Sequence, residues 1–250
     1  MSTAVAEKDR SKESAEKIYE NKLTLDEQYS AIRYYSEYIC EPLAIEDYVV
    51  QPAADVSPPK WHLAHTTWFF EEFILARYYK NYKRFHPDYS FLFNSYYESI
   101  GNRVQRPDRG NMSRPRVDEI YQYRAYVDEH MHWLLQDFPP DAVGLLEIGF
   151  NHEQQHQELL YTDIKYILGH NPLYPSYKKD IKETPHAEHD HCYLCVPEGK
   201  YTIGHQGTNF AYDNEHEAHV VLLKPFDIRS SLVTNGEYLQ FIQAGGYQRH

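Results

Sequence analysis

The stretch that decides the fold is NHEQQHQELL, residues 151–160. It lies inside a helical pattern that covers roughly 141–168 and ends at Gly169. His152 and His156 are four residues apart, so their rings stack on one face of that helix. HEQQH also fits H-E-x-x-H, in which two histidines bind zinc and the glutamate acts as general base. The stretch predicts a metal-binding helix and leaves its chemistry open.

A third ligand discriminates between metal chemistries better than the pattern does. One class of zinc peptidase continues H-E-x-x-H-x-x-G-x-x-H, but Leu159 and Thr162 occupy its last two fixed positions. That class is excluded. Glu153 is turned by about 100° from His152. Such an offset can still bring a glutamate to a metal-bound water, so helix geometry alone leaves other zinc peptidases open.

A second histidine pair stands in WHLAHTTWFFEE, residues 61–72, where His62 and His65 are three apart. One of them, together with the two histidines at 152 and 156, would supply three imidazole nitrogens from facing helices, as bundle cores commonly do. Three such ligands leave positions open for a substrate and O₂. The alternative is packing, because an isolated histidine on a bundle helix is more often packed than bound to metal.

The surrounding pattern predicts four helices, one long connection and a strand-rich end. Helices are expected over 24–49, from a Ser57 cap before two prolines to about 79, from 117, and over 141–168. Residues 81–116 read as a long ordered loop. From 192 onward, runs such as YLCVP, KYTIG and HVVLLKPFDI alternate with turn residues. The fold class is therefore α+β, with a helix bundle first.

The same pattern predicts four segments along the chain. About sixty strand-rich residues make a thin domain, so we expect the last segment to be incomplete. The expected segments are a polar lead-in over 1–22, a bundle with the metal site over 23–172, a linker over 173–191 and the incomplete domain over 192–250.

Composition excludes several functions. A formal net charge of −12 argues against nucleic acid and against anionic membranes as partners. No apolar run is long enough to span a bilayer, and the first twenty residues lack the apolar core of a signal peptide. Three cysteines, an odd number, fit a reduced cytoplasmic setting better than a disulfide framework.

Three stretches resemble the EgtB-type sulfoxide synthases of ergothioneine biosynthesis, whose ovothiol-forming relatives share the architecture. The resemblance covers essentially 25–250. The third stretch resembles the opening of a formylglycine-generating-enzyme-like (sulfatase-modifying-factor) domain, in which VTNGEY is expected as a turn. The three stretches are SPPKWHLAHTTWFFEEFIL at 57–75, HEQQHQELLYTDIKYIL at 152–168 and YDNEHEAHVVLLKPFDIRSSLVTNGEYLQFIQAGGY at 212–247.

The resemblance implies a DinB-like four-helix bundle fused to a C-type-lectin-like domain. It also implies a mononuclear non-haem Fe(II) held by His65, His152 and His156, with His62 structural or just outside the ligand shell. The implied reaction uses O₂ to join the sulfur of cysteine or γ-glutamylcysteine to C2 of the imidazole of Nα-trimethylhistidine, and oxidises that sulfur to a sulfoxide. Both thiols, and both ergothioneine-type and ovothiol-type regiochemistry, fit these motifs.

Further site residues follow from the resemblance. A tyrosine is expected as proton or hydrogen donor near the iron, and Tyr96 and Tyr97 are the candidates, with aromatic packing as the alternative. Arg103 and Arg106 would anchor the carboxylate of the thiol substrate by paired hydrogen bonds, with a plain surface role as the alternative. Gln155 would contact the imidazole of the second substrate.

Competing functions remain beside the sulfoxide synthase. One is a metal-dependent thiol transferase or hydrolase on a DinB-like bundle, which also uses three-histidine sites. Another is the zinc peptidase of the H-E-x-x-H pattern. The last is an inactive fragment that only binds a metal or a partner.

Overall fold

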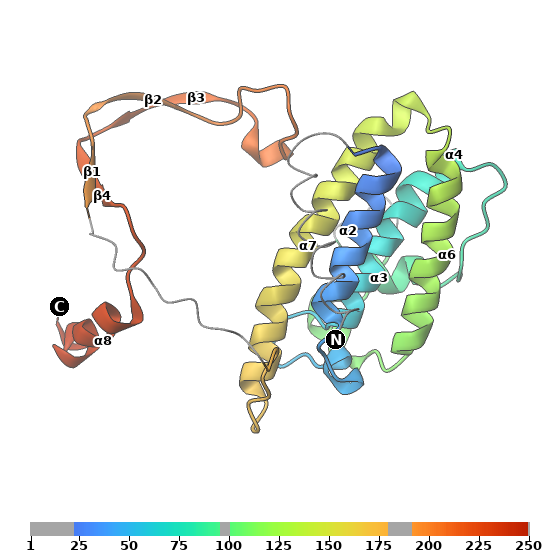
Figure 1. The fold of residues 1–250 in the computed structure, drawn as a ribbon, viewed down its shortest axis with the longest axis horizontal. Coiled ribbons are helices and arrows are strands. Elements are labelled where there is room, and N and C mark those ends of the chain that lie inside the picture. Colours follow the sequence, from blue (N-terminus) through green and yellow to red (C-terminus); the bar gives the residue numbers. More distant parts are fainter. Residues whose placement is uncertain (1–22, 96–100, 180–191, 250) are drawn as a thin grey trace, which may run out of the picture. The chain divides into compact units, whose positions relative to one another are not determined.

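The computed structural model describes residues 23–95, 101–179 and 192–249. The chain divides into two compact units, Met1–Ile181 and Lys182–His250. The described part of the first unit is helical, and that of the second carries small antiparallel sheets (Figure 1). The expected α+β class is confirmed.

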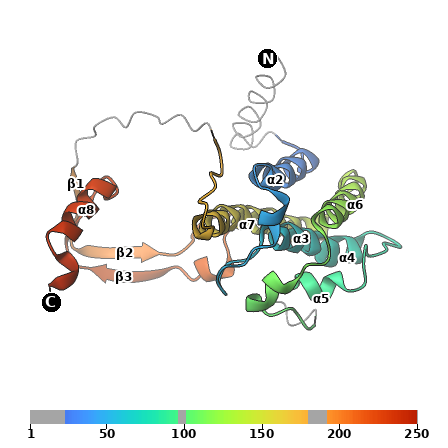
Figure 2. The same cartoon turned by 90° about the horizontal axis from the view of Figure 1, so that it is seen from below.

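The described part of the first unit contains four long helices. Helix α2 packs against α7, and α3 packs against both α6 and α7. Seen from below, α3 lies between α7 and α6 (Figure 2). Helix α3 continues without a break as a π-helix, Phe70–Leu75, and then as the short α4, Ala76–Tyr78. The bounds are Leu25–Cys40 for α2, Pro59–Phe69 for α3, Val117–Leu135 for α6 and Val143–His170 for α7.

The prediction of a single helix over 24–49 is wrong. Thr24 caps α2 through a reciprocal pair of hydrogen bonds with Glu27, but α2 ends at Cys40. A 3-10 helix, Ile45–Val49, follows after a turn. The physical reason is Pro42, because proline has no N–H to donate and its ring clashes with the preceding turn of a helix.

The expected cap at Ser57 is also wrong. Pro58 is the N-cap residue of α3, and no side chain caps that end. The Ser57 hydroxyl instead accepts a hydrogen bond from Arg109 Nη1 at 2.8 Å. Its backbone N–H donates to Asp163 Oδ2 at 2.9 Å. Ser57 therefore ties the start of α3 to α7 rather than capping its own helix.

The connection between α4 and α6 is long, as expected, and partly helical. It contains α5, Tyr89–Phe93, and a 3-10 helix, Arg106–Asn111. Helix α5 contacts α3. The connection therefore brings the backbone of α5 against α3.

A buried ionic cluster joins all four helices of the bundle. Glu153 of α7 is fully buried and accepts from Arg33 Nη1 at 2.9 Å and from Arg124 Nη2 at 3.3 Å. Ser36 of α2 also donates to this carboxylate. Burial raises the pKa of Glu153, but the two arginine charges and the hydrogen bonds outweigh it and hold that pKa below its usual value.

The same arginines reach the remaining helices. Arg33 of α2 donates to Asp128 of α6 and to Thr67 of α3. Arg124 of α6 donates to the backbone carbonyl of Leu63 in α3. Every helix of the bundle thus contributes a group to one hydrogen-bonded cluster, which fixes their mutual rotation.

Gly149 sets the approach of α7 to α3 and its π-helical continuation. A Cβ added there would lie 2.7 Å from Cε1 of Phe70 and 3.1 Å from Cε1 of Phe69, closer than carbon atoms pack. A side chain at this position would push the two helices apart. This contact lies one turn before His152 on the same helix.

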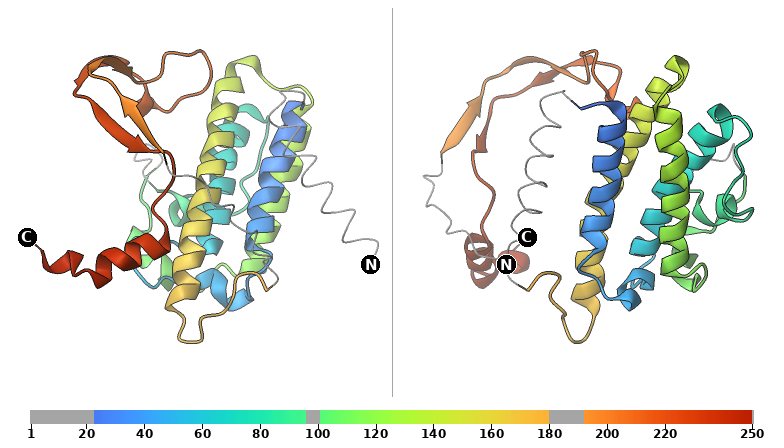
Figure 3. Two further views of the ribbon diagram at one scale, coloured as in Figure 1. Left: turned by 60° about the vertical axis from the view of Figure 1, so that its left-hand side comes forward. Right: turned by 45° about the vertical axis from the view of Figure 1, so that its right-hand side comes forward.

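The described part of the second unit, residues 192–249, holds two antiparallel strand pairs, one α-helix and two short 3-10 helices. Strand β1, Tyr193–Val196, pairs with β4, Phe226–Arg229. Strand β2, Gly199–Ile203, pairs with β3, His219–Leu223. Figure 3 shows the paired strands as a narrow ribbon. The strands expected in the runs YLCVP, KYTIG and HVVLLKPFDI are therefore confirmed, with the last run split in two before Phe226.

The turn expected in VTNGEY is wrong. Thr234 caps helix α8, Asn235–Gln243, and the Asn-Gly pair forms its first turn. The Thr234 hydroxyl accepts from the backbone N–H of Glu237, whose carboxylate accepts from the N–H of Thr234. This reciprocal cap outweighs the turn preference of Asn-Gly.

Within the described residues, no helix is both long and apolar enough to cross a membrane.

Substituting Gly149 tests the close approach of α7. We expect Gly149→Ala to be less stable than Gly144→Ala by about 1–3 kcal/mol, the cost of overpacking a core. Both lie on α7, but a Cβ at Gly144 meets nothing within 4 Å. Urea unfolding of both variants measures the difference. Equal stabilities would contradict the close contact.

Substituting Glu153 tests the ionic cluster. We expect Glu153→Gln to lower the free energy of unfolding by about 3–5 kcal/mol, because it leaves two buried arginines short of a counter-charge. Glu158→Gln, at an exposed position on the same helix, should change it by less than about 0.5 kcal/mol. A Glu153→Gln variant as stable as the parent would show that the carboxylate is not structural.

Candidate metal centre

Three histidines meet between α3 and α7. His65 comes from α3, and His152 and His156 come from α7. One ring nitrogen from each can be chosen so that all three lie within 4.8 Å of one another. His65 and His156 are buried, whereas His152 is half-buried. The structure thus brings together the three residues that the sequence singled out as ligands.

The ring of His65 is held on both faces and at one edge. It stacks between Trp61 and Trp68, with ring centroids 4.5 and 5.4 Å away. Its Nδ1 lies 2.6 Å from the backbone oxygen of Phe93 in α5. A carbonyl oxygen only accepts, so Nδ1 carries the proton and Nε2 keeps the lone pair.

The ring of His156 is held by a second histidine. Its Nδ1 lies 2.8 Å from Nδ1 of His62, and Nε2 of His62 lies 2.9 Å from Oδ2 of Asp163. His62 is therefore adjacent to the cluster rather than part of it. The sequence reasoning placed His62 there as a structural or neighbouring group but did not find Asp163.

His152 lies at the more open side of the cluster. Its ring packs 4.9 Å from that of Phe69. Its Nδ1 is buried and has no hydrogen-bond partner among the described residues. Burying a ring nitrogen without a partner costs free energy. A metal cation bound by His152 would give the ring a favourable interaction that offsets this cost.

The electrostatics favour neutral imidazoles. Burial lowers the pKa of His152 to about 4. Burial, and then the charge of His152, lowers the pKa of His65 well below its usual value. The pKa of His156 is lowered in the same way, by burial and then by His65. Metal ligands must be deprotonated imidazoles, so the three residues present fit a divalent transition metal.

Glu153 cannot play the part that the H-E-x-x-H pattern gives it. Its side chain is fully buried in the ionic cluster with Arg33 and Arg124, and both of its oxygens accept hydrogen bonds there. A general base needs to reach the reacting proton, directly or through a water. The structure therefore argues against the zinc-peptidase interpretation.

The other residues that the sequence predicted for the site are not part of the histidine cluster. Gln155 is exposed on α7 beside His156. Arg103 and Arg106 are half-buried in the long connection, and Arg106 Nη2 donates to the backbone oxygen of Asp55. Tyr96 and Tyr97 lie outside the described residues.

Sequence reasoning missed Arg109. Its guanidinium carbon lies 3.3 Å from the ring centroid of Trp61, and its nitrogens donate to Ser57 and Ser95. Its charge contributes to the lowered pKa of His65. The available signal was its position, three residues after Arg106 in the Arg106–Asn111 helix. A buried cation next to the histidines favours an anionic ligand there.

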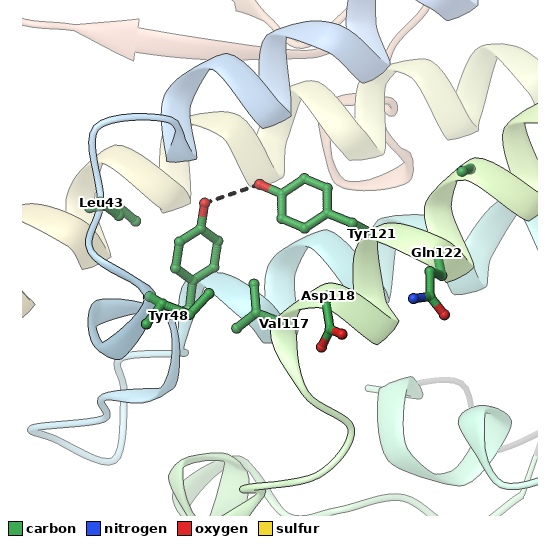
Figure 4. Close-up of a pocket in the computed structure, with 8 residues that line it drawn as sticks. Leu43, Tyr48, Val117, Asp118, Tyr121 and Gln122 are labelled. Carbon is green, nitrogen blue, oxygen red and sulfur yellow. Dashed lines mark hydrogen bonds between the residues drawn. The ribbon is translucent and has the colours of Figure 1, made fainter.

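A separate apolar cavity of about 650 Å³ lies beside α6 (Figure 4). Its other wall is formed by the segment that follows α2. Tyr48 and Tyr121 face each other across it, with their hydroxyls 3.0 Å apart. None of the three histidines lines it, so we do not assign the metal site to it. The lining residues are Leu43, Ile45, Tyr48, Val117, Asp118, Tyr121, Gln122 and Ala125.

Comparisons with known proteins extend the sequence resemblance. Residues 177–250 match the model of the sulfatase-modifying factor enzyme 1-like domain family. Hercynine oxygenase of Mycolicibacterium smegmatis is 27% identical, with 59% of this chain and 40% of the relative covered. The resemblance to EgtB-type enzymes is confirmed. The chain spans about 40% of the length of this curated relative.

Proposed function

We propose that this chain carries the metal site of a non-haem Fe(II), O₂-dependent sulfoxide synthase of ergothioneine biosynthesis. It would join the sulfur of cysteine or γ-glutamylcysteine to the imidazole C2 of Nα-trimethylhistidine (hercynine). The observation that carries the proposal is the cluster of three histidines between α3 and α7, of which His65 and His156 are buried. Similarity to hercynine oxygenase and to the sulfatase-modifying-factor family supports it.

His65, His152 and His156 would hold the metal. When bound, iron would supply the O₂ and one-electron chemistry that side chains cannot. Three neutral ligands leave the charge of the cation uncompensated, which favours a thiolate as substrate. Two buried carboxylates of α7 are engaged elsewhere, Glu153 with two arginines and Asp163 with His62.

The remaining groups would bind and orient the substrates. Arg109 would add positive charge beside His65, supporting binding of an anionic thiol substrate. Arg103 and Arg106 would receive the substrate carboxylate. Gln155, an exposed residue next to His156 in the sequence of α7, would contact the hercynine imidazole. Tyr96 and Tyr97 stay proposals as proton donors.

A second candidate is a metal-dependent thiol transferase or hydrolase on a DinB-like bundle. The observation that favours it is that all three histidines belong to the first unit. Such a site needs nothing from the strand-rich unit. The match of 177–250 to the sulfatase-modifying-factor family favours the first candidate.

Metal binding tests the site. We expect the chain to bind one Fe(II) under anaerobic conditions. Replacing His65, His152 or His156 by Ala should weaken binding by more than about 100-fold, because a ligand matters more than a group outside the coordination sphere. His170→Ala, at an exposed position on α7, is the matched control and should bind as the parent does. Undiminished binding by the three ligand variants would refute the site.

Turnover tests the reaction. The Fe(II)-loaded chain is given hercynine, either thiol and O₂, and mass spectrometry is used to look for the sulfoxide conjugate. Product that is lost in His152→Ala but kept in His170→Ala supports the proposal. Thiol transfer without O₂ would favour the second candidate. Zinc-dependent peptide cleavage would revive the peptidase, and iron binding without any turnover would indicate a fragment that only binds metal.

A further inference from the structure

His62 bridges two side chains of α7. It projects from α3 and is 2% exposed. Its two ring nitrogens contact His156 and Asp163, which lie seven residues, or about two turns, apart on α7. Both nitrogens of a buried histidine are therefore engaged in one chain of hydrogen bonds that ends at the metal site.

The direction of this chain follows from the groups at its end. Asp163 Oδ2 accepts from the backbone N–H of Ser57 at 2.9 Å, and a carboxylate also accepts from its second neighbour. Nε2 of His62 is then the donor of the 2.9 Å contact to Asp163. A neutral imidazole donates at one nitrogen and accepts at the other, so Nδ1 of His62 is an acceptor.

The acceptor role of His62 Nδ1 determines the tautomer of His156. The 2.8 Å contact between the two Nδ1 atoms requires one proton between them. With His62 accepting, that proton belongs to His156 Nδ1, which leaves Nε2 as the bare lone pair. A His62 that carried protons on both nitrogens would reverse the contact and put the proton of His156 on Nε2, where it would block a metal.

We propose that His62, oriented by Asp163, is a positioning residue of the metal site that holds His156 in the tautomer with a free Nε2. This inference rests on the proposed metal site. His65 reaches the same tautomer through the backbone oxygen of Phe93. Partners of this kind outside the coordination sphere orient a ligand and raise its basicity.

The tautomer can be read without any metal. Side-chain ¹⁵N NMR of the metal-free chain distinguishes protonated from bare ring nitrogens. We expect His156 to show a protonated Nδ1 and a bare Nε2, and His62 to show the reverse. A protonated Nε2 on His156 would overturn the inference, whatever the chain binds.

Two substitutions separate a positioning role from a packing role. In His62→Asn, the amide oxygen stands near the position of Nδ1 and can still accept from His156. In His62→Gln, the amide reaches toward Asp163 and leaves the His156 proton without an acceptor. We expect anaerobic Co²⁺ titration to show binding 10–100-fold weaker for the Gln variant, with the Asn variant within about threefold of the parent.

The outcomes distinguish the two proposals. Thermal unfolding of both variants, metal-free, controls for packing, since a merely structural role would lower stability without separating their affinities. A parent chain that binds no metal would refute the proposed function. The NMR result would still decide which nitrogen of His156 is protonated. A parent that binds metal, with a Gln variant that binds equally well, would overturn the role of His62.

Discussion

The rest of the bundle depends on one buried carboxylate, Glu153. It is held by Arg33 of α2 and Arg124 of α6, and those arginines donate onward to groups of α3 and α6. A buried ion pair contributes little net stability, because desolvation offsets attraction, but breaking it is costly. Its effect here is geometric. With Glu153 fixed toward α2 and α6, the rotation of α7 about its axis turns His152 and His156 toward α3.

The approach of α7 to α3 provides the second constraint. The missing side chain at Gly149 lets α7 settle against Phe69 and Phe70 one turn before His152. Trp61 and Trp68 then enclose His65 from both sides. Rotation of α7 and its distance from α3 together decide where the three rings meet, and packed aromatic side chains keep them there.

The sequence predicted much of the helical part and less of its ends. Apolar periodicity located the helices of the bundle, because it is a local property of the chain. It missed the stop that Pro42 imposes on the first helix, which is a steric effect and not a periodic one. The Ser-Pro-Pro pattern gave Ser57 a capping role, but the partners that its hydroxyl and N–H find are Arg109 and Asp163, from distant segments. The role of Arg109 was not predicted, because its partners Trp61 and Ser57 lie about fifty residues earlier in the sequence.

By itself the sequence determined that two histidines share one face of a helix, because a spacing of four does so in any α-helix. It also carried the resemblance that singled out His65. Only the tertiary structure decided which ring nitrogen His65 and His156 can offer and where the side chain of Glu153 lies. Those outcomes depend on Phe93, Asp163 and Arg33, which come from distant segments of the chain. A tautomer is set by the partner across a hydrogen bond, and folding supplies that partner.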